Sequence, residues 1–181
     1  MIERFVKDNK TYIIGYHTQE CRYTDLEAPI KCTTKEAWLG VGFYFWVEEE
    51  FAKYWGEDFK KGKNGYYDIY KANLEADNLI NAVFDEKGYF FFRKCIEDAI
   101  LHFNNNGKKV SLEQVTRFLA DNFWKRLNVT GIIYDDIPVN PQKKERVYSE
   151  IFPLYYKKRI QIVVFNLKNI NKFEIYLTEL C

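Results

Sequence analysis

The sequence is poor in the residues that usually bind metal ions. It holds only two histidines and four cysteines, which are His17, His102, Cys21, Cys32, Cys95 and Cys181. No two of the cysteines form a CxxC pair, so the spacing typical of a zinc site is missing. We therefore expect no metal ion. The sequence does not indicate a disulfide framework, and we expect reduced thiols in a cytoplasmic protein.

Long hydrophobic runs and a strong net charge are also missing. No stretch approaches the roughly 18 apolar residues of a membrane-spanning helix. The first residues, MIERFVKDNKTYIIGYH, lack the apolar run of a signal peptide. The formal net charge is only +1, which excludes a chain that is basic all over for binding nucleic acid. We expect no contact with a membrane.

Several catalytic and nucleotide-binding motifs do not occur either. The sequence contains no GxGxxG, GxxxxGK[ST], HExxH or GxSxG motif. The GVG at 40–42 is a lone GxG, which by itself indicates nothing definite. Neither histidine stands at a recognisable spacing from a cysteine, so the sequence does not indicate a cysteine nucleophile with a histidine base.

What the chain does contain is a clear series of strand and helix patterns. Hydrophobic residues make up 47% and aromatic residues 18% of the sequence, enough for the core of a single domain, 1–181. We expect strands at 10–18, 66–74, 129–137, 160–167 and 172–177, and a further strand after the glycines of GVGFYFW. We expect helices from Thr33, over 47–59, over 86–103, and from Ser111 to about Leu127. Strands, a helical middle and strands again are typical of the α+β class.

Three residues stand out against these patterns. His17 ends the first strand, Tyr44 follows the GxG inside an aromatic strand, and Gln161 begins an otherwise apolar strand. A polar side chain at the head of an apolar strand needs a partner or a purpose. Taken singly, each has a structural explanation, which for His17 and Tyr44 is the more usual one: a structural histidine, a core aromatic residue and, for Gln161, a solvated strand end.

Taken together, they resemble a known family. The order of YHT, GVGFYFW, EEEFAKYWG and IVVFNLKNI, from about residue 11 to 175, is similar to the ADP-ribosyltransferase superfamily in its diphtheria-toxin and poly(ADP-ribose) polymerase-like branch. That branch has a strand-end His, a Tyr in a G-x-G-[IF]-Y-F segment and a Glu on a later strand. The resemblance implies split antiparallel β-sheets around an NAD cleft, with the helical segment 86–127 as an insertion.

The resemblance also implies roles for particular residues. His17 would hydrogen-bond an NAD ribose, and the backbone of Thr18 would hold the nicotinamide amide, where the family often has Gly. Tyr44 would form one wall of the nicotinamide slot, and Tyr54 would supply the second, stacking ring. The Ser that usually contacts the amide between those two tyrosines has no counterpart in this sequence.

Gln161 matches the position of the family's catalytic Glu. In the family reaction, a carboxylate stabilises the positive charge that develops on the ribose, and Gln can hydrogen-bond the ribose but supplies no charge. Glu150 is our candidate for a replacement acid. Asp135 and Asp136 are weaker candidates, because a pair of aspartates at a strand end is also typical of a turn cap.

The segment 141–159 combines basic and aromatic residues, which suits phosphate contact and base stacking, although a solvated loop is also consistent with it. Its basic residues are Lys143, Lys144, Arg146, Lys157, Lys158 and Arg159, and its aromatic residues are Tyr148, Phe152, Tyr155 and Tyr156. If the resemblance holds, the acceptor docks here, which favours a nucleic acid or an acidic protein surface.

The resemblance implies an enzyme that transfers ADP-ribose from NAD to a macromolecular acceptor, protein or nucleic acid. Mono-ADP-ribosylation is expected, because chain elongation in the family depends on the missing Glu. A toxin or defence effector with an antitoxin-like partner would suit a small domain of this kind. Two alternatives stay open: a non-catalytic module that binds NAD or ADP-ribose, and a nucleic-acid-binding domain without NAD chemistry.

Overall fold

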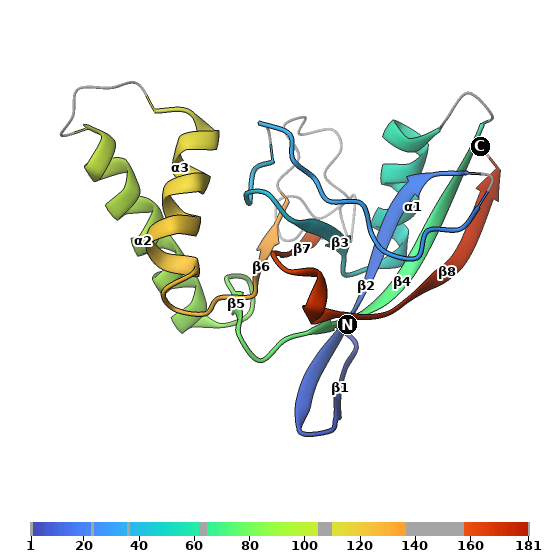
Figure 1. Cartoon of the computed structure of the whole chain (residues 1–181), viewed down its shortest axis with the longest axis horizontal. Helices are drawn as coiled ribbons and strands as arrows, with labels where there is room; N and C mark the ends of the chain where they lie inside the picture. Colours follow the sequence, from blue (N-terminus) through green and yellow to red (C-terminus); the bar gives the residue numbers. More distant parts are fainter. Residues whose placement is uncertain are drawn as a thin grey trace, which may run out of the picture.

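The strands of the protein form one mostly antiparallel sheet with helices at opposite sides of it (Figure 1). The computed structural model describes residues 2–22, 24–35, 37–61, 65–104, 110–136 and 158–180. The strands are β1 (Arg4–Lys7), β2 (Lys10–Glu20), β3 (Phe43–Trp46), β4 (Tyr66–Glu75), β5 (Leu79–Asn81), β6 (Gly131–Asp135), β7 (Ile160–Val164) and β8 (Ile170–Leu180). The helices are α1 (Glu49–Trp55), α2 (Glu86–Asn104) and α3 (Leu112–Leu119), with π-helical turns η1 (Gly56–Lys60) and η2 (Ala120–Trp124) and the 3-10 helix η4 (Leu167–Asn169). The predicted α+β class is confirmed.

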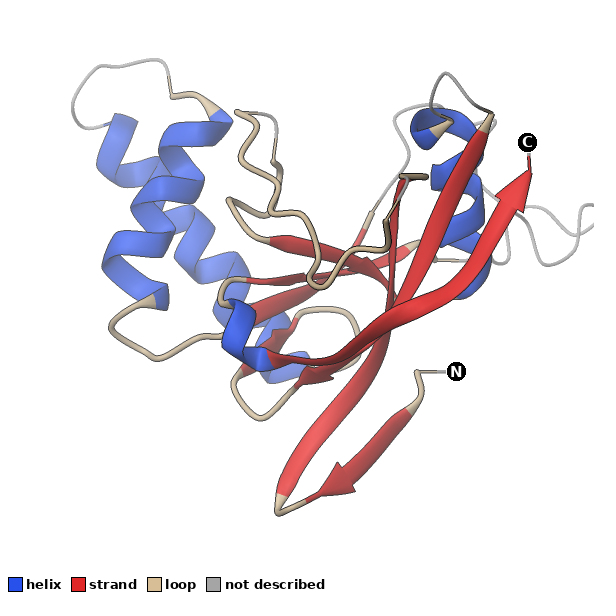
Figure 2. Cartoon of the chain, turned by 45° about the vertical axis from the view of Figure 1, so that its right-hand side comes forward, coloured by secondary structure: helices blue, strands red, loops and turns tan. Residues whose placement is uncertain are grey.

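The sheet consists of two halves that are barely joined. Its strand order is β5-β6-β7-β3-β2-β4-β8, with β1 also paired to β2. β2 and β4 pair continuously along β2 from Tyr12 to Glu20. Within the described residues, β2 and β3 share the single pair Tyr16–Trp46. Beyond that pair the two strands diverge, and Figure 2 shows the long strands β2, β4 and β8 running at a clear angle to the short ones. The resemblance implied two separate sheets, whereas this structure has one sheet with two halves.

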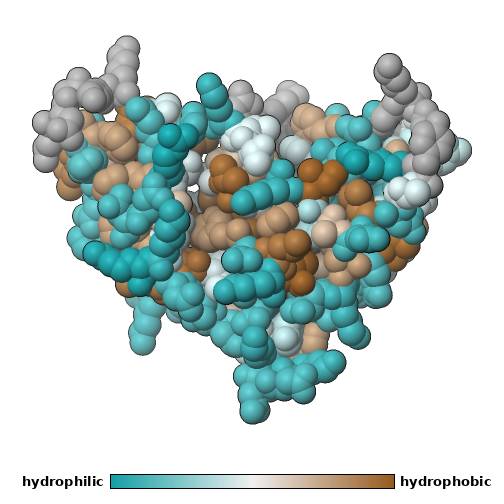
Figure 3. Space-filling view, in the orientation of Figure 1, coloured by the Kyte–Doolittle hydropathy of each residue, from teal (hydrophilic) through white to brown (hydrophobic). Residues whose placement is uncertain are grey.

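Hydrophobic side chains fill the space between the two halves of the sheet. They also cover the outer face of each half. The central core includes Ile13, Phe45, Leu74, Ile133 and Ile162, all at most 1% exposed. α2 and α3 cover the outer face of the β3-β7-β6-β5 half, and α1 covers that of the β2-β4 half. All five residues of β7 are buried, because both faces of this strand are covered. Figure 3 shows apolar surface gathered in the middle of the visible face, between α2 and α3 on one side and the long strands on the other.

The helical middle of the chain follows the sequence prediction closely. α2 spans Glu86–Asn104, where 86–103 was expected. Ser111 caps α3 by accepting a hydrogen bond from the Gln114 backbone N–H, and the Gln114 side chain returns a bond to the Ser111 backbone. This capping box satisfies two N–H groups that would otherwise lack partners. Within the described residues, no helix has both the length and the apolar character needed to span a membrane.

The helix expected from Thr33 is wrong. The described residues of this stretch form turns, in which Ala37 N–H donates to the Thr34 carbonyl and Gly40 N–H to the Ala37 carbonyl. The physical reason is a backbone bridge between Cys32 and Gly42, which ties the two ends of the segment together. A loop that must close over so few residues has no room for a helix, whose ends lie far apart. We call this segment the Cys32–Gly42 loop.

Two features of the sheet were not predicted. β1 and β2 form a hairpin whose turn residues, Asp8 and Asn9, both have positive φ angles, 50° and 60°. Such two-residue turns match the twist of the strands they join. β5 and β6 pair in parallel, so α2 and α3 form the crossover between two parallel strands inside a sheet that is otherwise antiparallel.

Candidate functional site

A cavity of about 550 Å³ opens where β2 and β3 diverge. Its walls come from the end of β2, the Cys32–Gly42 loop, β3, Gln161 of β7, and the α1–η1 helix. The expected residues His17, Thr18, Tyr44 and Gln161 all line it. We call it the His17 cavity. Residues from three distant parts of the chain, predicted to act together, therefore do lie around one space.

His17 is held in a fixed orientation and a fixed tautomer. Its side chain is 7% exposed, and its Nδ1 lies 2.9 Å from the carbonyl oxygen of Tyr44. A carbonyl only accepts hydrogen bonds, so Nδ1 carries the hydrogen and Nε2 is left with a lone pair. Within the described part of the chain, this buried Nε2 has no hydrogen-bond partner. It is therefore an acceptor that a ligand hydroxyl could satisfy.

Burial also keeps His17 neutral. Removal from water, with a smaller contribution from the charge of Lys60, lowers the pKa of the imidazole to about 4, and only the bond to the Tyr44 carbonyl acts in the other direction. The rings of Phe45 and Phe173 flank the imidazole, with centroids 5.6 Å and 6.0 Å away. At neutral pH this histidine is a hydrogen-bond acceptor and carries no charge.

The backbone of Thr18 faces the cavity. Cys21 N–H donates across to β4, and Ile14 N–H donates toward β1 at the opposite edge of β2. Because backbone groups alternate between the two edges of a strand, Thr18 points to the same edge as Ile14. In the described residues no strand pairs with that edge beyond Tyr16. The Thr18 hydroxyl is engaged elsewhere, since it donates to the Ala52 carbonyl of α1 at 2.8 Å.

Tyr44 lines the cavity, but its hydroxyl is engaged outside it. The hydroxyl donates to the Gly40 carbonyl at 2.8 Å and accepts from the Leu39 N–H at 3.1 Å. Burial raises the pKa of this phenol well above its ordinary value. Tyr44 thus pins the Cys32–Gly42 loop onto β3, and its role toward any ligand is that of a rigid wall.

Gln161 is not a solvated strand end. It is 7% exposed, and its Oε1 accepts a hydrogen bond from Trp38 Nε1 at 3.2 Å. In the sheet it stands opposite Trp46 on one side and Tyr134 on the other. With the oxygen engaged by Trp38, the amide NH₂ is the group that remains for a ligand, and it is a donor.

The expected second ring is supplied by a different residue. Tyr54 is 42% exposed, its hydroxyl donates to Glu50, and it does not line the cavity. Trp55 lines the cavity instead. The buried Phe51 lies four residues before Trp55 on α1, and residues four apart share a helix face. Tyr54, three residues after Phe51, also fits that face, so the spacing in the sequence could not choose between the two rings.

One carboxylate among the described residues lines the cavity, that of Asp136. The carboxylate of Asp136 pairs with the Arg159 guanidinium at 2.8 Å. The guanidinium also lies over the Trp46 ring. Burial raises the pKa of Asp136 and the neighbouring Asp135 adds to the effect, although Arg159 opposes it. Asp135 lies outside this cavity, 3.8 Å from Lys158.

Glu150 and most of the basic and aromatic segment 141–159 lie outside the described residues. Two cations, Lys31 and Lys60, also line the His17 cavity. Lys60 is the last residue of η1, and π-helical turns of this kind are frequent at functional sites. With two cations against one carboxylate that is already paired, the cavity suits a ligand that carries negative charge.

Comparisons of the chain with protein-family models, with curated proteins and with solved structures found no match.

Proposed function

We propose that the protein binds NAD in the His17 cavity and transfers its ADP-ribose to a macromolecular acceptor. The observation that carries this proposal is the convergence of His17, Thr18, Tyr44 and Gln161 on one cavity. The divergence of β2 from β3, which opens that cavity, also supports the split-sheet arrangement that the resemblance implies. A volume of about 550 Å³ is within the usual range for a cofactor site.

Each part of NAD has a chemical counterpart in this wall. The nicotinamide carboxamide both donates and accepts, as does the strand edge at Thr18, and the flat ring fits between Tyr44 and Trp55. A ribose hydroxyl would donate to the unpartnered Nε2 of His17. The diphosphate would lie near Lys31 and Lys60.

In the proposed reaction, the bond between the ribose C1′ and the nicotinamide nitrogen breaks, and its electron pair leaves with nicotinamide. An acceptor oxygen or nitrogen then forms the new bond to C1′ and loses its proton to a base. Asp136 is the described carboxylate that could take this proton, because burial raises its pKa and so its basicity. Gln161 would hold the ribose by a hydrogen bond without supplying charge, and we therefore expect slow transfer.

The same observations favour a second candidate function. The Oε1 of Gln161 is bonded to Trp38, and Asp136 is paired with Arg159. A cavity whose polar groups are held in this way would bind NAD or ADP-ribose without reacting with it. The third reading, nucleic-acid binding through 141–159, rests on residues outside the described ranges and stays a prediction.

One experiment separates these functions. NAD binding is measured by isothermal titration calorimetry for the wild type, for His17→Ala and for His102→Ala, a matched control because His102 is exposed on α2. NAD labelled in the adenine is then incubated with each variant and with cellular protein or RNA. The ADP-ribosyltransferase is supported if the wild type and His102→Ala transfer the label and His17→Ala does not. If NAD binds but no label is transferred, the non-catalytic binding module is supported. Absence of NAD binding to the wild type overturns both.

A role as a toxin or defence effector follows from the family resemblance alone. If it is correct, expression of the wild type slows growth of the host cell while expression of His17→Ala does not. Growth rescue in a screen of co-expressed genes would then reveal an antitoxin-like partner.

A further inference from the structure

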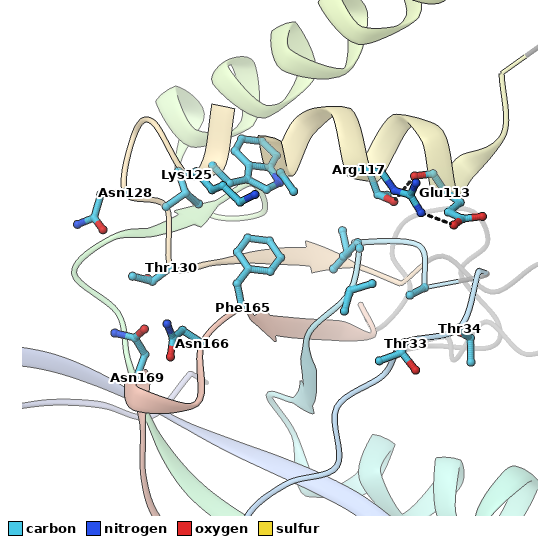
Figure 4. Close-up of a pocket in the computed structure, with 18 of the residues that line it drawn as sticks. Thr33, Thr34, Glu113, Arg117, Lys125, Asn128, Thr130, Phe165, Asn166 and Asn169 are labelled. Carbon is cyan, nitrogen blue, oxygen red and sulfur yellow. Dashed lines mark hydrogen bonds and ion pairs between the residues drawn. The ribbon is translucent and has the colours of Figure 1, made fainter. Parts of the chain in front are cut away.

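A second cavity, of about 470 Å³, lies on the other side of the Cys32–Gly42 loop (Figure 4). It is bounded by that loop, by α3 and η2, by the residues that precede β6, and by the segment from Phe165 to Asn169. None of the residues expected from the sequence to act in function lines it. We call it the Asn169 cavity.

Two buried polar atoms in its wall have no partner. Asn169 is 5% exposed, and within the described residues its Oδ1 accepts no hydrogen bond. Within the described residues the hydroxyl oxygen of Thr130 also has no partner. The backbone N–H of Thr130 donates to the Asn78 carbonyl, and its carbonyl accepts from the Phe165 N–H. An unsatisfied buried polar atom costs about 1–3 kcal/mol. Both residues line one cavity, so their oxygens are polar groups to which a ligand in it could bond.

The rest of the wall defines the chemistry of that ligand. Figure 4 shows Phe165 in the middle of the cavity, with Thr130 and Asn169 at one end and Arg117 at the other. The buried ring of Trp124 also lines the space. Aromatic side chains of this kind stack on flat heterocycles, and an Asn amide can bond an adenine-type edge by accepting from its amino group.

The rim is cationic. Four cationic side chains line the cavity, against the single carboxylate of Glu113 among the described residues; they are Lys35, Arg117, Lys125 and Lys168. Arg117 is paired with Glu113 at 2.7 Å, and Lys125 is paired with Asp121 at 2.6 Å. The positive charge that would attract a phosphate group at this rim therefore comes mainly from Lys35 and Lys168. The adjoining η2 is a π-helical turn like η1, so each cavity has one such turn in its wall among the described residues.

We propose that the Asn169 cavity binds a free nucleoside monophosphate whose base carries an amino group, of the adenine type. The base would contact Phe165 and place its amino group at Asn169, with a further bond to the Thr130 hydroxyl. The phosphate would reach the cationic rim. This site is separate from the His17 cavity and does not depend on the NAD proposal.

The test is calorimetric titration of the whole chain with AMP, IMP, adenosine and inorganic phosphate. We expect AMP to bind more tightly than adenosine, IMP, whose base lacks the amino group, to bind about tenfold more weakly than AMP, and phosphate alone not to bind measurably. Asn169→Leu and Thr130→Val should each weaken AMP binding by about tenfold, the loss of one hydrogen bond. Asn171→Leu and Thr24→Val, at exposed positions outside the cavity, should leave it unchanged.

A second readout protects the test against simple misfolding. Because Thr130→Val removes an unsatisfied oxygen and keeps the shape of the side chain, the free variant should melt at the same temperature as the wild type or higher. The proposal is overturned if AMP does not bind at millimolar concentration. It is also overturned if His17→Ala removes AMP binding while Asn169→Leu does not, since AMP would then occupy the other cavity.

Discussion

The Nδ1 of His17 and the carbonyl oxygen of Tyr44 lie 2.9 Å apart, at the point where the two halves of the sheet separate. This contact fixes the tautomer of His17 and joins β2 to β3 where the strands themselves no longer pair. Because the ring of His17 is buried beside Lys60, protonation of His17 would place a second positive charge there.

We predict that this histidine makes the protein sensitive to acid. Burial lowers the pKa of His17 to about 4 in the folded protein, from about 6.5 when unfolded. The unfolded chain therefore binds the proton more readily, so the stabilising contribution is complete above pH 6.5 and is lost as the pH falls toward 4. The shift corresponds to at most about 3 kcal/mol. Urea unfolding of the wild type and of His17→Asn between pH 6.5 and 4 measures this contribution. The difference between their free energies of unfolding should shrink as the pH falls. A constant difference would contradict the assigned protonation state.

We predict that Gln161→Glu accelerates ADP-ribose transfer. A carboxylate at this position would stabilise the positive charge on the ribose, an effect of about 100-fold to 1000-fold at well-placed groups. Single-turnover kinetics with labelled NAD measure the change. Gln114→Glu is the matched control, because Gln114 belongs to the capping box of α3, where Glu serves equally well. A rate that stays the same in Gln161→Glu would show that this side chain does not face the ribose.

We predict that neighbouring aromatic residues of α1 differ sharply in their effect on NAD binding. Trp55→Ala removes a ring from the wall of the His17 cavity, whereas Tyr54→Ala removes a ring that is exposed outside it. Loss of a stacking ring should weaken binding by about 1–3 kcal/mol, roughly 5-fold to 150-fold. Titration calorimetry of both variants is the measurement. Equal affinities would argue against nicotinamide stacking on Trp55.

We predict that Gly56→Ala destabilises the protein, although alanine favours helices. Gly56 has helical backbone angles, φ −59° and ψ −52°, but an added Cβ would lie 2.3 Å from the ring of Tyr67. Tyr67 is 2% exposed and cannot move aside easily. Overpacking of this kind costs about 1–3 kcal/mol, which thermal and urea unfolding would detect. In the double variant Gly56→Ala/Tyr67→Leu much of the loss should be recovered, and additive effects would contradict the clash.

The longer strands were predictable because β-branched and aromatic residues are frequent in them. β2, β4 and β8 were expected at nearly their observed positions, since such runs are a local pattern that the sequence displays. The cavity residues His17, Tyr44 and Gln161 were found because their order along the chain resembles a family pattern, not because any one of them is unusual by itself. The role implied for the Thr18 backbone, which faces the cavity, stays a prediction.

The errors have a different origin, since they depend on contacts between distant parts of the chain. The Cys32–Gly42 bridge prevents the helix that the Thr33 capping pattern indicates. Tyr54 and Trp55 cannot be distinguished until α1 is packed on β2. The unpartnered atoms of Thr130 and Asn169 could not be predicted at all, because an absent partner becomes visible only when every neighbour is in position.

The Cys32–Gly42 loop forms part of the wall of both cavities, through Thr33, Thr34 and Ala37. A ligand that shifts this loop from one side changes the shape offered to a ligand on the other side. The two affinities are then thermodynamically linked, and each ligand must alter the binding constant of the other by the same factor. A single loop, anchored by the Tyr44 hydroxyl, would in that way couple the proposed binding of a free nucleotide to the proposed binding of NAD.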